Sequence, residues 1–316
     1  MDKQKILIIF GIVLLLALTS AWFLIPGKLQ ISTSASYLAN SQGVFDFLKT
    51  DSNWKKWWPG KQTKEAHNKM GYNFSGYDFN VDKILYQAYE IILSGKHENY
   101  SALMKIILVS NDSTRIEFTT EINAGTNPIK RIAGYFEARR VKKIFDAIIQ
   151  SLVSYTKDVK NIYGFNIHNE KVQMEYLLSA NLELTHYPST EEVYSLIEKI
   201  RTYLKTTDAK EEFSPMLNIE TNDRSHYFMR IGVPVNKKLP GTDSISVKQM
   251  LKNGNILVAE VTGGNNTIEY ALKQFEKYIS DYQRSIVAIP FQSLETDRLK
   301  VPDSTKWITK IYYPVI

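Results

Sequence analysis

The sequence contains no cysteine, which excludes disulfides, thiolate metal sites and a cysteine nucleophile. It also lacks a G-x-S-x-G motif, a P-loop and a dinucleotide-binding glycine pattern, which mark common classes of hydrolases and nucleotide-binding enzymes. The five histidines stand far apart, without the spacing of metal ligands: they are His67, His97, His168, His186 and His226. We therefore predict no catalytic residue, no metal and no cofactor.

A concentrated block of one charge does not stand out either. Lysine and arginine are scattered among aspartate and glutamate, and together they give a net charge of +6 and a pI of about 9.1. No nucleic-acid recognition motif accompanies this charge. A solvated surface with mild attraction to anionic lipid accounts for it better than nucleic-acid binding does. We predict no nucleic-acid partner.

What the sequence does have is one long apolar run, which begins at Ile6, ends at Ile25 and contains no charge. About twenty apolar residues are enough to cross a hydrocarbon core about 30 Å thick as a helix. Lys3 and Lys5 precede the run, and positive charge tends to stay in the cytoplasm. We predict a single-pass membrane anchor over residues 1–27, with a cytoplasmic N-terminus and the rest of the chain in the periplasm or outside the cell.

Two other interpretations of this run stay open. A cleaved signal peptide has an apolar core of about 7–15 residues and an Ala-x-Ala-like site, whereas this run is longer and its best site, at residues 19–21, is poor. The other alternative is a buried core helix. Trp22, near the end of the run, suits an aromatic residue at a membrane interface. The residues that follow the run are enough for about two domains.

Residues 28–156 show periodicities in the order strand, short helix, antiparallel sheet, long helix. The predicted strands cover 31–36, 84–94, 100–110 and 114–122, and the predicted helices cover 41–48 and 128–155. A turn at residues 111–113 joins the last two strands into a hairpin. The apolar stripe of the long helix is made of Ile132, Phe136, Val141, Ile144, Phe145, Ile148 and Leu152.

A tryptophan-rich segment, Asn53-Trp54-Lys55-Lys56-Trp57-Trp58-Pro59, follows the short helix. Together with the order of elements, it resembles the tryptophan-rich turn of the START/polyketide-cyclase-like (SRPBCC) superfamily. The resemblance implies a helix-grip domain over residues 28–156, in which a sheet curls around the long helix and leaves a cavity for an apolar ligand. Trp54 is a candidate ligand contact. For Trp57 and Trp58, packing of the helix against the sheet is the favoured interpretation.

Residues 157–316 contain an internal repeat, which fixes their architecture. A shift of 75 residues superposes two helical stripes, so that Val193 meets Ile268 and Pro215 meets Pro290. At the end of the chain the shift becomes 80, and the five extra residues fall in the loop of the second hairpin. Each repeat therefore predicts strand, helix, strand, strand: 180–185, 190–205, 214–220 and 227–235, then 255–261, 267–282, 287–296 and 306–315.

The second repeat carries Gly263-Gly264 before its helix and ends on Ile289-Pro290-Phe291 followed by the aromatic segment 307–315. In these features the region resembles the gyrase-inhibitor-like, AraC-effector-binding (SHS2-type) domain family. The resemblance implies that a groove between the repeats binds a small, often apolar or cationic ligand. Many members attach this domain to a DNA-binding helix-turn-helix. This sequence shows no such element, so direct transcriptional regulation is not expected.

One departure from the family pattern concerns charge in the groove. Where the family often has a glutamate and a tyrosine, this sequence has Gln292 and Leu294. A neutral glutamine attracts a cation less strongly than a buried carboxylate does. Glu260 and Glu295 could supply charge instead, although alternation along the strand favours a solvent-facing Glu260. A cationic ligand is therefore possible but not indicated.

The sequence thus predicts an α+β protein made of an N-terminal transmembrane helix, a helix-grip domain and a duplicated strand-helix-strand-strand domain with antiparallel sheets. The leading function is a membrane-anchored sensor or carrier that binds a small apolar or amphipathic molecule between the two repeats. The alternatives are a hydrolase that acts through Glu260 or Glu295, and a non-catalytic interaction scaffold. The candidate ligand contacts are Tyr176, Glu260, Phe291, Gln292, Trp307, Tyr312 and, in the helix-grip domain, Trp54.

Overall fold

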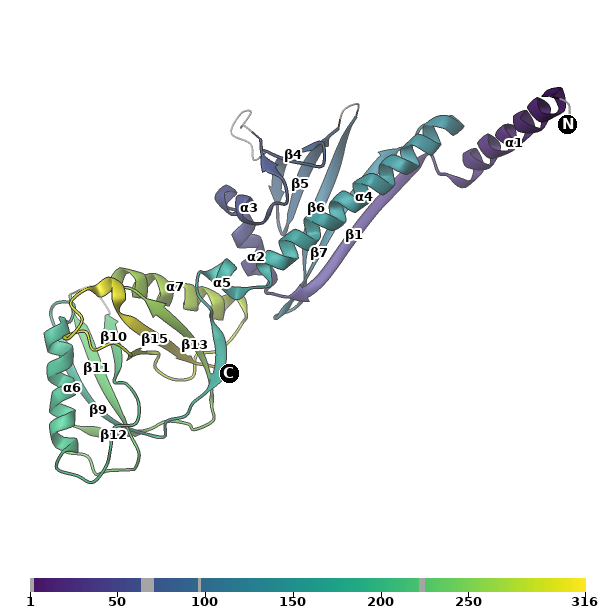
Figure 1. The fold of residues 1–316 in the computed structure, drawn as a ribbon. Helices are drawn as coiled ribbons and strands as arrows, with labels where there is room; N and C mark the ends of the chain where they lie inside the picture. The colour runs from purple at the N-terminus through teal and green to yellow at the C-terminus, as the bar shows by residue number, and fades with distance from the viewer. Residues whose placement is uncertain (1–2, 64–70, 96–97, 222–224) are drawn as a thin grey trace. The chain divides into compact units, whose positions relative to one another are not determined.

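The computed structural model describes residues 3–63, 71–95, 98–221 and 225–316 (Figure 1). The chain divides into two compact units, Met1–Asp158 and Val159–Ile316, which we call the N-terminal unit and the repeat unit. This division falls close to the boundary at residue 156 that the sequence predicts. Both units combine helices with one antiparallel sheet, which confirms the predicted α+β class.

The N-terminal unit begins with the apolar helix α1 (Lys3–Leu24). Among the described residues, this is the one helix that is long and apolar enough to cross a membrane. None of its most apolar stretch is buried within the structure, whereas a core helix would be covered by the rest of its unit. A signal sequence meets the same criteria, so membrane anchoring stays a prediction at this point.

Seven strands follow in one antiparallel sheet of order β1-β7-β6-β5-β4-β3-β2. They are β1 (Lys28–Leu38), β2 (Lys61–Gln62), β3 (Gly71–Phe74), β4 (Tyr77–Leu85), β5 (Ala88–Ser94), β6 (Asn99–Ser110) and β7 (Ser113–Asn123). The helices of this unit are α2 (Ser41–Leu48), α3 (Asp51–Trp57) and the long α4 (Pro128–Thr156). The sheet curves around α4, which packs on β1 and β7 (Figure 1). This is the helix-grip arrangement that the order of elements predicts.

The single strand predicted over 84–94 is wrong, because the chain turns back there between β4 and β5. Gln87 in this turn has a φ of 51°, in the left-handed region that glycine and asparagine adopt most readily. No residue of that kind marks the position. The hairpin therefore looks like one continuous apolar strand in the sequence.

The second half of α4 holds the helix on the sheet. Phe145 stacks on Phe118 of β7, with ring centroids 3.9 Å apart. At the helix end, the hydroxyls of Tyr37 and Thr156 share a hydrogen bond of 2.6 Å. The first half is different, because Phe136, which the sequence places in the same apolar stripe, is 63% exposed. The predicted stripe is therefore correct for the second half of α4 and wrong for the first.

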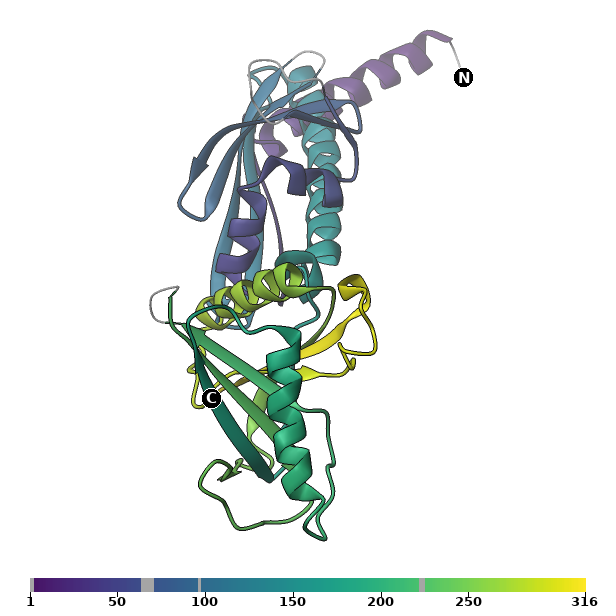
Figure 2. The same ribbon diagram turned by 90° about the vertical axis from the view of Figure 1, so that its left-hand side faces the viewer.

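The repeat unit has eight strands in one sheet of order β12-β9-β11-β10-β14-β15-β13-β8. They are β8 (His168–Lys171), β9 (Tyr176–Leu184), β10 (Met216–Thr221), β11 (Tyr227–Val235), β12 (Ser246–Gln249), β13 (Asn255–Thr262), β14 (Phe291–Leu294) and β15 (Ile308–Pro314). The helices are α5 (Val159–Tyr163), α6 (Thr190–Leu204), α7 (Asn265–Asp281) and the short 3-10 helix η1 (Ser304–Lys306). Figure 2 shows α6, in teal, in front of the strands of the first repeat.

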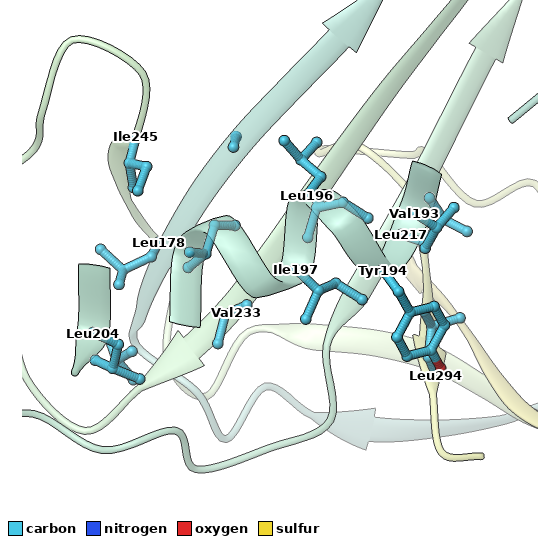
Figure 3. Close-up of a cluster of buried hydrophobic side chains, with 14 of the residues drawn as sticks. Leu178, Val193, Tyr194, Leu196, Ile197, Leu204, Leu217, Val233, Ile245 and Leu294 are labelled. Carbon is cyan, nitrogen blue, oxygen red and sulfur yellow. The ribbon is translucent and has the colours of Figure 1, made fainter. Parts of the chain in front are cut away.

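The strand order confirms the duplication. The first repeat contributes β9-β11-β10, the second contributes β14-β15-β13, and the two meet where β10 pairs with β14. Each half buries its own helix. Ile197 and Ile200 of α6 pack with Leu178 and Val233 in one cluster (Figure 3), and α7 packs in a second cluster over β13 and β15.

The short edge strands β8 and β12 are not predicted by the sequence. Each precedes one repeat and pairs with the leading strand of the other, so that β8 lies beside β13 and β12 beside β9. The segments that follow them, residues 172–175 and 250–254, bond to each other. The Met250 amide donates to the Glu175 carbonyl at 2.8 Å, and the Asn253 amide donates to the Val172 carbonyl at 2.9 Å. We call these two segments the crossing segments.

Candidate functional site

A groove of about 680 Å³ lies in the repeat unit, where the two repeats join. Its volume is within the range of about 300–1,000 Å³ that is typical of small-molecule sites. At the join, Met216 of β10 is in register with Ser293 of β14. The groove is lined by residues from β8, the first crossing segment, α6, the loop before β10, and the strands β13, β14 and β15.

The floor of the groove is apolar and belongs to a cluster on the sheet that is separate from the helix-packing clusters. Val172 and Met174 of the first crossing segment pack there with Met216 and Ile256. Tyr312 of β15 packs against the same cluster and lines the groove. Its ring stacks on the buried Phe291, with centroids 4.9 Å apart and an angle of 17° between the rings. The aliphatic side chains of this cluster are at most 8% exposed, and Tyr312 is the half-buried aromatic side chain that covers part of them at the groove.

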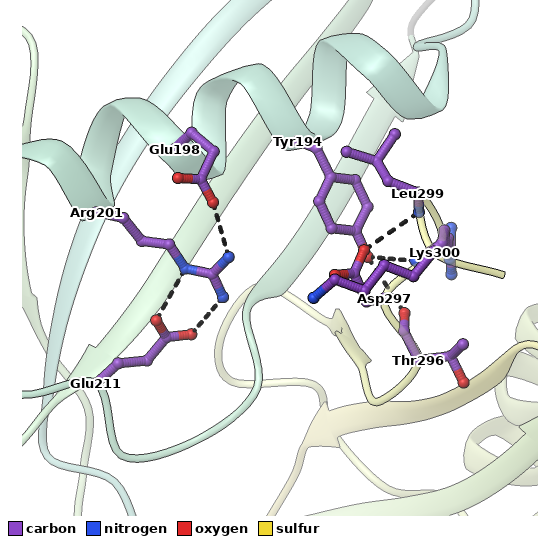
Figure 4. Close-up of polar contacts among 9 residues, drawn as sticks. Tyr194, Glu198, Arg201, Glu211, Thr296, Asp297, Leu299 and Lys300 are labelled. Carbon is purple, nitrogen blue, oxygen red and sulfur yellow. Dashed lines mark hydrogen bonds and ion pairs between the residues drawn. The ribbon is translucent and has the colours of Figure 1, made fainter.

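One wall of the groove is held by an ion-pair network on α6 (Figure 4). The Arg201 guanidinium donates to both carboxylate oxygens of Glu211 at 2.9 Å, and a third N–H donates to Glu198 at 2.9 Å. The hydrogen bonds to Glu211 raise the pKa of Arg201 above its ordinary value. Arg201 lines the groove, but its charge is matched by two carboxylates, so it adds little attraction for an anion.

Another part of the lining is the loop between β14 and β15, which is anchored on α6 by Tyr194 (Figure 4). The Tyr194 hydroxyl donates to the Thr296 carbonyl at 3.2 Å and accepts from the Arg298 amide at 2.8 Å. Inside the loop, the Trp307 indole N–H donates to the Val301 carbonyl at 2.7 Å. The Arg298 guanidinium lies 4.7 Å from the centre of the Trp307 ring. These contacts fix the loop and place Asp297 at the groove.

Carboxylates outnumber cations along the rim, which also includes Lys171 and Lys310. Glu170, Glu212 and Glu295 are exposed and line the groove. The hydroxyls of Ser293 and Ser214 donate to Glu295 at 2.8 and 3.2 Å, which orients this carboxylate. Burial, reinforced by Glu170 and Glu295, raises the pKa of Tyr312 to about 12. At neutral pH Tyr312 is therefore an uncharged hydrogen-bond donor beside a negatively charged rim.

The sequence-predicted site residues fall in different places. Tyr312 lines the groove, and Phe291 lies against it in the same cluster. Gln292 and Trp307 are buried nearby, and neither lines the groove. Tyr176 is half-buried at the start of β9 and packs against the α6 cluster. Its hydrogen bond with Glu175 raises the pKa of its hydroxyl.

Two further predicted residues lie away from the groove. Glu260 is exposed on β13, in register with Lys310 of β15, and does not line the groove. Trp54 is in the N-terminal unit, 1% exposed, with its indole N–H bonded to the Leu48 carbonyl at 2.6 Å. It is enclosed by Trp57, Trp58, Tyr72 and Tyr89, with ring centroids between 5.0 and 6.0 Å away.

Several groove residues have no signal in the sequence. Val172 and Met174 are isolated apolar residues in a stretch that looks like a linker, and they reach the groove only because β8 pairs with the far repeat. Glu211 and Glu212 look like a surface pair before a strand. The approximate two-fold relation of the repeats could have indicated Val172 and Met174, because the segment before each repeat pairs with the leading strand of the other.

The histidines form no cluster where they are described. His67 and His97 lie outside the described residues, and His168, His186 and His226 are exposed. In the part of the chain that the structure describes, no group of three or more His, Asp or Glu side chains could hold a metal ion.

The N-terminal unit has a second groove, of about 850 Å³, between the first half of α4 and the strand ends beside it. Tyr77, Tyr100 and Ile122 line it together with Glu137 and Arg140 of α4. The Tyr77 hydroxyl donates to Glu137, and the Arg140 guanidinium lies 5.4 Å from the centre of the Tyr77 ring. This groove occupies the position of the predicted helix-grip cavity, but its lining is more polar than an apolar ligand would require.

No family model matches the sequence, and no curated protein matches it. Among solved structures, the chain is similar to the EcmrR C-terminal domain, with 13% identity over 48% of this chain and 98% of that one and a TM-score of 0.41. It is similar to SAV2435 bound to tetraphenylphosphonium, with 15% identity over 48% and 93% and a TM-score of 0.34. It is also similar to the Zhui aromatase/cyclase from Streptomyces sp. R1128, with 8% identity over 41% and 94% and a TM-score of 0.30. At these values the likenesses concern the fold alone.

Proposed function

We propose that the repeat unit binds a small amphipathic molecule that carries a positively charged or hydrogen-bond-donating group. The observation that carries the proposal is the groove of about 680 Å³ at the join of the repeats, with an apolar floor and a rim of carboxylates. Concave sites with an apolar lining and a few placed polar groups are typical of small-molecule binding. The apolar part of the ligand would lie on Tyr312 and Met174, and its polar group would face Glu295.

The charge of the rim decides which polar group fits. Five carboxylates line the groove, namely Glu170, Glu211, Glu212, Glu295 and Asp297, and three cations line it with them, namely Lys171, Arg201 and Lys310, so the lining has two more negative than positive side chains. The sequence does not indicate a cationic ligand, because Gln292 replaces the family's glutamate. The rim supplies that charge from other positions.

We further propose that the protein is held at a membrane by α1, with both units on the outer side. The length and composition of α1, the absence of burial along it and Trp22 at its end support this attachment. A binding unit tethered in this way would act as a sensor or a carrier for molecules near the membrane surface.

A hydrolase is the second candidate function, and Glu295 is the carboxylate that favours it. Glu295 lies in the groove close to Tyr312, whereas Glu260 is exposed outside it. Tyr312 is protonated at neutral pH, so it could donate a hydrogen bond but could not act as a base. Hydrolysis of a p-nitrophenyl ester that disappears in Glu295→Gln would favour this candidate over binding alone.

The binding proposal is tested with two matched substitutions, Glu295→Gln in the groove and Glu260→Gln outside it. Each removes one negative charge from an exposed side chain of the same sheet or its adjoining loop. With tetraphenylphosphonium as the probe, calorimetry on the full chain should show about fivefold weaker binding for Glu295→Gln, equivalent to about 1 kcal/mol. Binding by Glu260→Gln should be unchanged.

A neutral probe of similar shape, triphenylphosphine oxide, separates charge from shape. It should bind the wild type and Glu295→Gln equally, because it has no positive charge for Glu295 to attract. Equal losses in Glu295→Gln and Glu260→Gln would contradict the groove as the binding site. If the heat measured for both probes equals the heat measured when they are injected into detergent buffer without protein, the result would contradict small-molecule binding in this groove.

A further inference from the structure

The helix α4 changes its apolar face along its length. Phe136 and Val141 are five residues apart, which turns the helix by about 140° between them. Val141, Phe145 and Ile148 face the sheet and are buried. Ile129, Ile132 and Phe136 therefore lie on the side that points away from the core of the unit.

Exposure agrees with this change of face. Ile129 is 69% exposed and Phe136 is 63% exposed, although both are large apolar side chains at the start of a 29-residue helix. Tyr135 beside them is also exposed. Isolated apolar residues on a surface need no explanation, but several on one helical face indicate a partner.

The same stretch has a net charge close to that of the whole chain. From Pro128 to Lys143 there are six basic residues and one acidic residue, a net charge of +5, while the whole chain has +6. The one acidic side chain, Glu137, accepts a hydrogen bond from Tyr77 within the unit. By helical spacing, Arg139 and Lys143 continue the face of Ile129 and Phe136 over the next two turns. We call the residues Ile129, Ile132, Phe136, Arg139 and Lys143 the α4 outer face.

The start of α4 is bonded to the end of α1. The Trp22 indole N–H donates to the Thr126 carbonyl at 3.0 Å, just before α4 begins. The Arg131 guanidinium donates to the Ile25 carbonyl at 3.0 Å and to the Trp22 carbonyl, and it lies 5.1 Å from the centre of the Trp22 ring. These bonds join the α4 outer face to the point where α1 would leave a bilayer.

We propose that the α4 outer face lies on the surface of the membrane and binds anionic lipid headgroups. This inference rests on the proposed attachment through α1. Apolar side chains beside basic ones on one helical face are the pattern of interfacial helices, in which the apolar groups enter the boundary and the basic groups contact anionic headgroups. A protein partner would not require the basic half of the face, and the continuity with α1 places the face next to lipid.

Because the chain has no cysteine, single cysteines can report on each position. We would introduce Leu14→Cys in α1, Phe136→Cys on the α4 outer face and Tyr86→Cys as a control. Tyr86 is 86% exposed in the β4–β5 turn, away from the α4 outer face. Each full-length variant is labelled with an environment-sensitive dye and reconstituted into vesicles that contain nitroxide-labelled lipid. The vesicles are phosphatidylcholine alone or an equal mixture with phosphatidylglycerol.

In the mixed vesicles we expect the dye at Phe136→Cys to be quenched about threefold more strongly than the dye at Tyr86→Cys. In phosphatidylcholine alone this difference should shrink. When Arg139→Gln and Lys143→Gln are added to the Phe136→Cys variant, the difference in quenching should also shrink in the mixed vesicles. These side chains are exposed or half-buried at the surface of α4, so the substitutions should not disturb the core.

The Leu14→Cys dye separates this inference from the attachment on which it rests. Quenching at Leu14→Cys without quenching at Phe136→Cys would overturn the surface contact and leave the attachment intact. An unquenched Leu14→Cys dye would overturn the attachment itself. If the dye at Phe136→Cys is quenched equally in phosphatidylcholine vesicles and in the mixed vesicles, the preference for anionic headgroups would be overturned. A disulfide-linked dimer of Phe136→Cys in detergent would assign the face to a second copy of the chain.

Discussion

The two units use aromatic side chains in opposite ways. In the N-terminal unit, Trp54 is enclosed by Trp57, Trp58, Tyr72 and Tyr89, and its N–H is bonded within the unit. In the repeat unit, Tyr312 stacks on Phe291 on one side and borders the groove on the other. We call the first set the closed cluster and the second the open pair.

The comparison shows that aromatic content alone does not identify a ligand site. The closed cluster has more rings, yet all its rings face other side chains and its large buried area serves packing. The open pair is smaller, but one ring face lies beside apolar residues and carboxylates at a groove. What decides the role is the set of groups that faces the ring.

The largest expected effect is on the closed cluster. Trp54→Ala should reduce the free energy of unfolding of the N-terminal unit by about 3–5 kcal/mol, because it removes a fully buried ring and leaves a cavity. Urea unfolding followed by tryptophan fluorescence measures this. Trp57 and Trp58, in the same unit, supply the signal in the variant.

Ligand binding is the control for the same variant. If the closed cluster only packs the helices against the sheet, Trp54→Ala should bind tetraphenylphosphonium as the wild type does wherever the variant remains folded. If Trp54→Ala instead binds tetraphenylphosphonium more weakly while its free energy of unfolding is unchanged, Trp54 would be a ligand contact, as the resemblance to the helix-grip superfamily suggests, and not only a packing residue.

The second largest expected effect is a loss of ligand affinity when the open pair is disrupted. Tyr312→Leu should weaken tetraphenylphosphonium binding about tenfold, since it removes both the stacked ring and its hydroxyl from the floor of the groove. The cost in stability should be about 1 kcal/mol or less, because Tyr312 is only partly buried and leucine fills much of its space. Calorimetry and thermal unfolding of the same sample give the two numbers.

Tyr270→Leu is the matched control for this substitution. Tyr270 is an exposed tyrosine on α7 in the same unit, 5.9 Å from the ring of Phe165 and outside the groove. Its replacement should leave probe binding unchanged. If both variants lose affinity equally, the probe is not bound at the open pair.

Much of the repeat unit could be predicted from the sequence because its elements are marked twice. The helix stripes of α6 and α7 coincide under one shift, and Pro215 and Pro290 mark the same position before a strand in each repeat. Agreement between two copies compensates for the weak signal of each. The helix α2 was also predicted with the bounds that the structure has, since Asn40 caps it and Val44, Phe45 and Leu48 form its apolar side.

The rest could not be predicted because it depends on long-range pairing or on a missing local signal. Gln87 makes a turn without a turn residue. The strands β8 and β12 are short and find their partners in the other repeat, so no local pattern indicates them. The first half of α4 departs from the predicted core stripe, because the five-residue step from Phe136 to Val141 breaks the helical period.

The smallest expected effect concerns the ionisation of Tyr312, and it tests how freely water reaches the Tyr312 hydroxyl in the open pair. Burial and then the nearby Glu170 and Glu295 raise the pKa of Tyr312 to about 12, above the ordinary value of about 10. Because the folded value is the higher one, the contribution of Tyr312 to stability is complete below about pH 10 and is lost as the pH rises through about 12.

A difference titration of tyrosinate absorbance, wild type minus Tyr312→Phe, should show one group with a midpoint near 12. Glu295→Gln should move that midpoint down, since it removes one of the carboxylates that oppose the phenolate. A midpoint near 10 would instead mean that water reaches the hydroxyl freely. With the higher value, Tyr312 stays neutral at physiological pH, so the negative charge proposed to face a cationic group comes from the rim carboxylates and not from Tyr312.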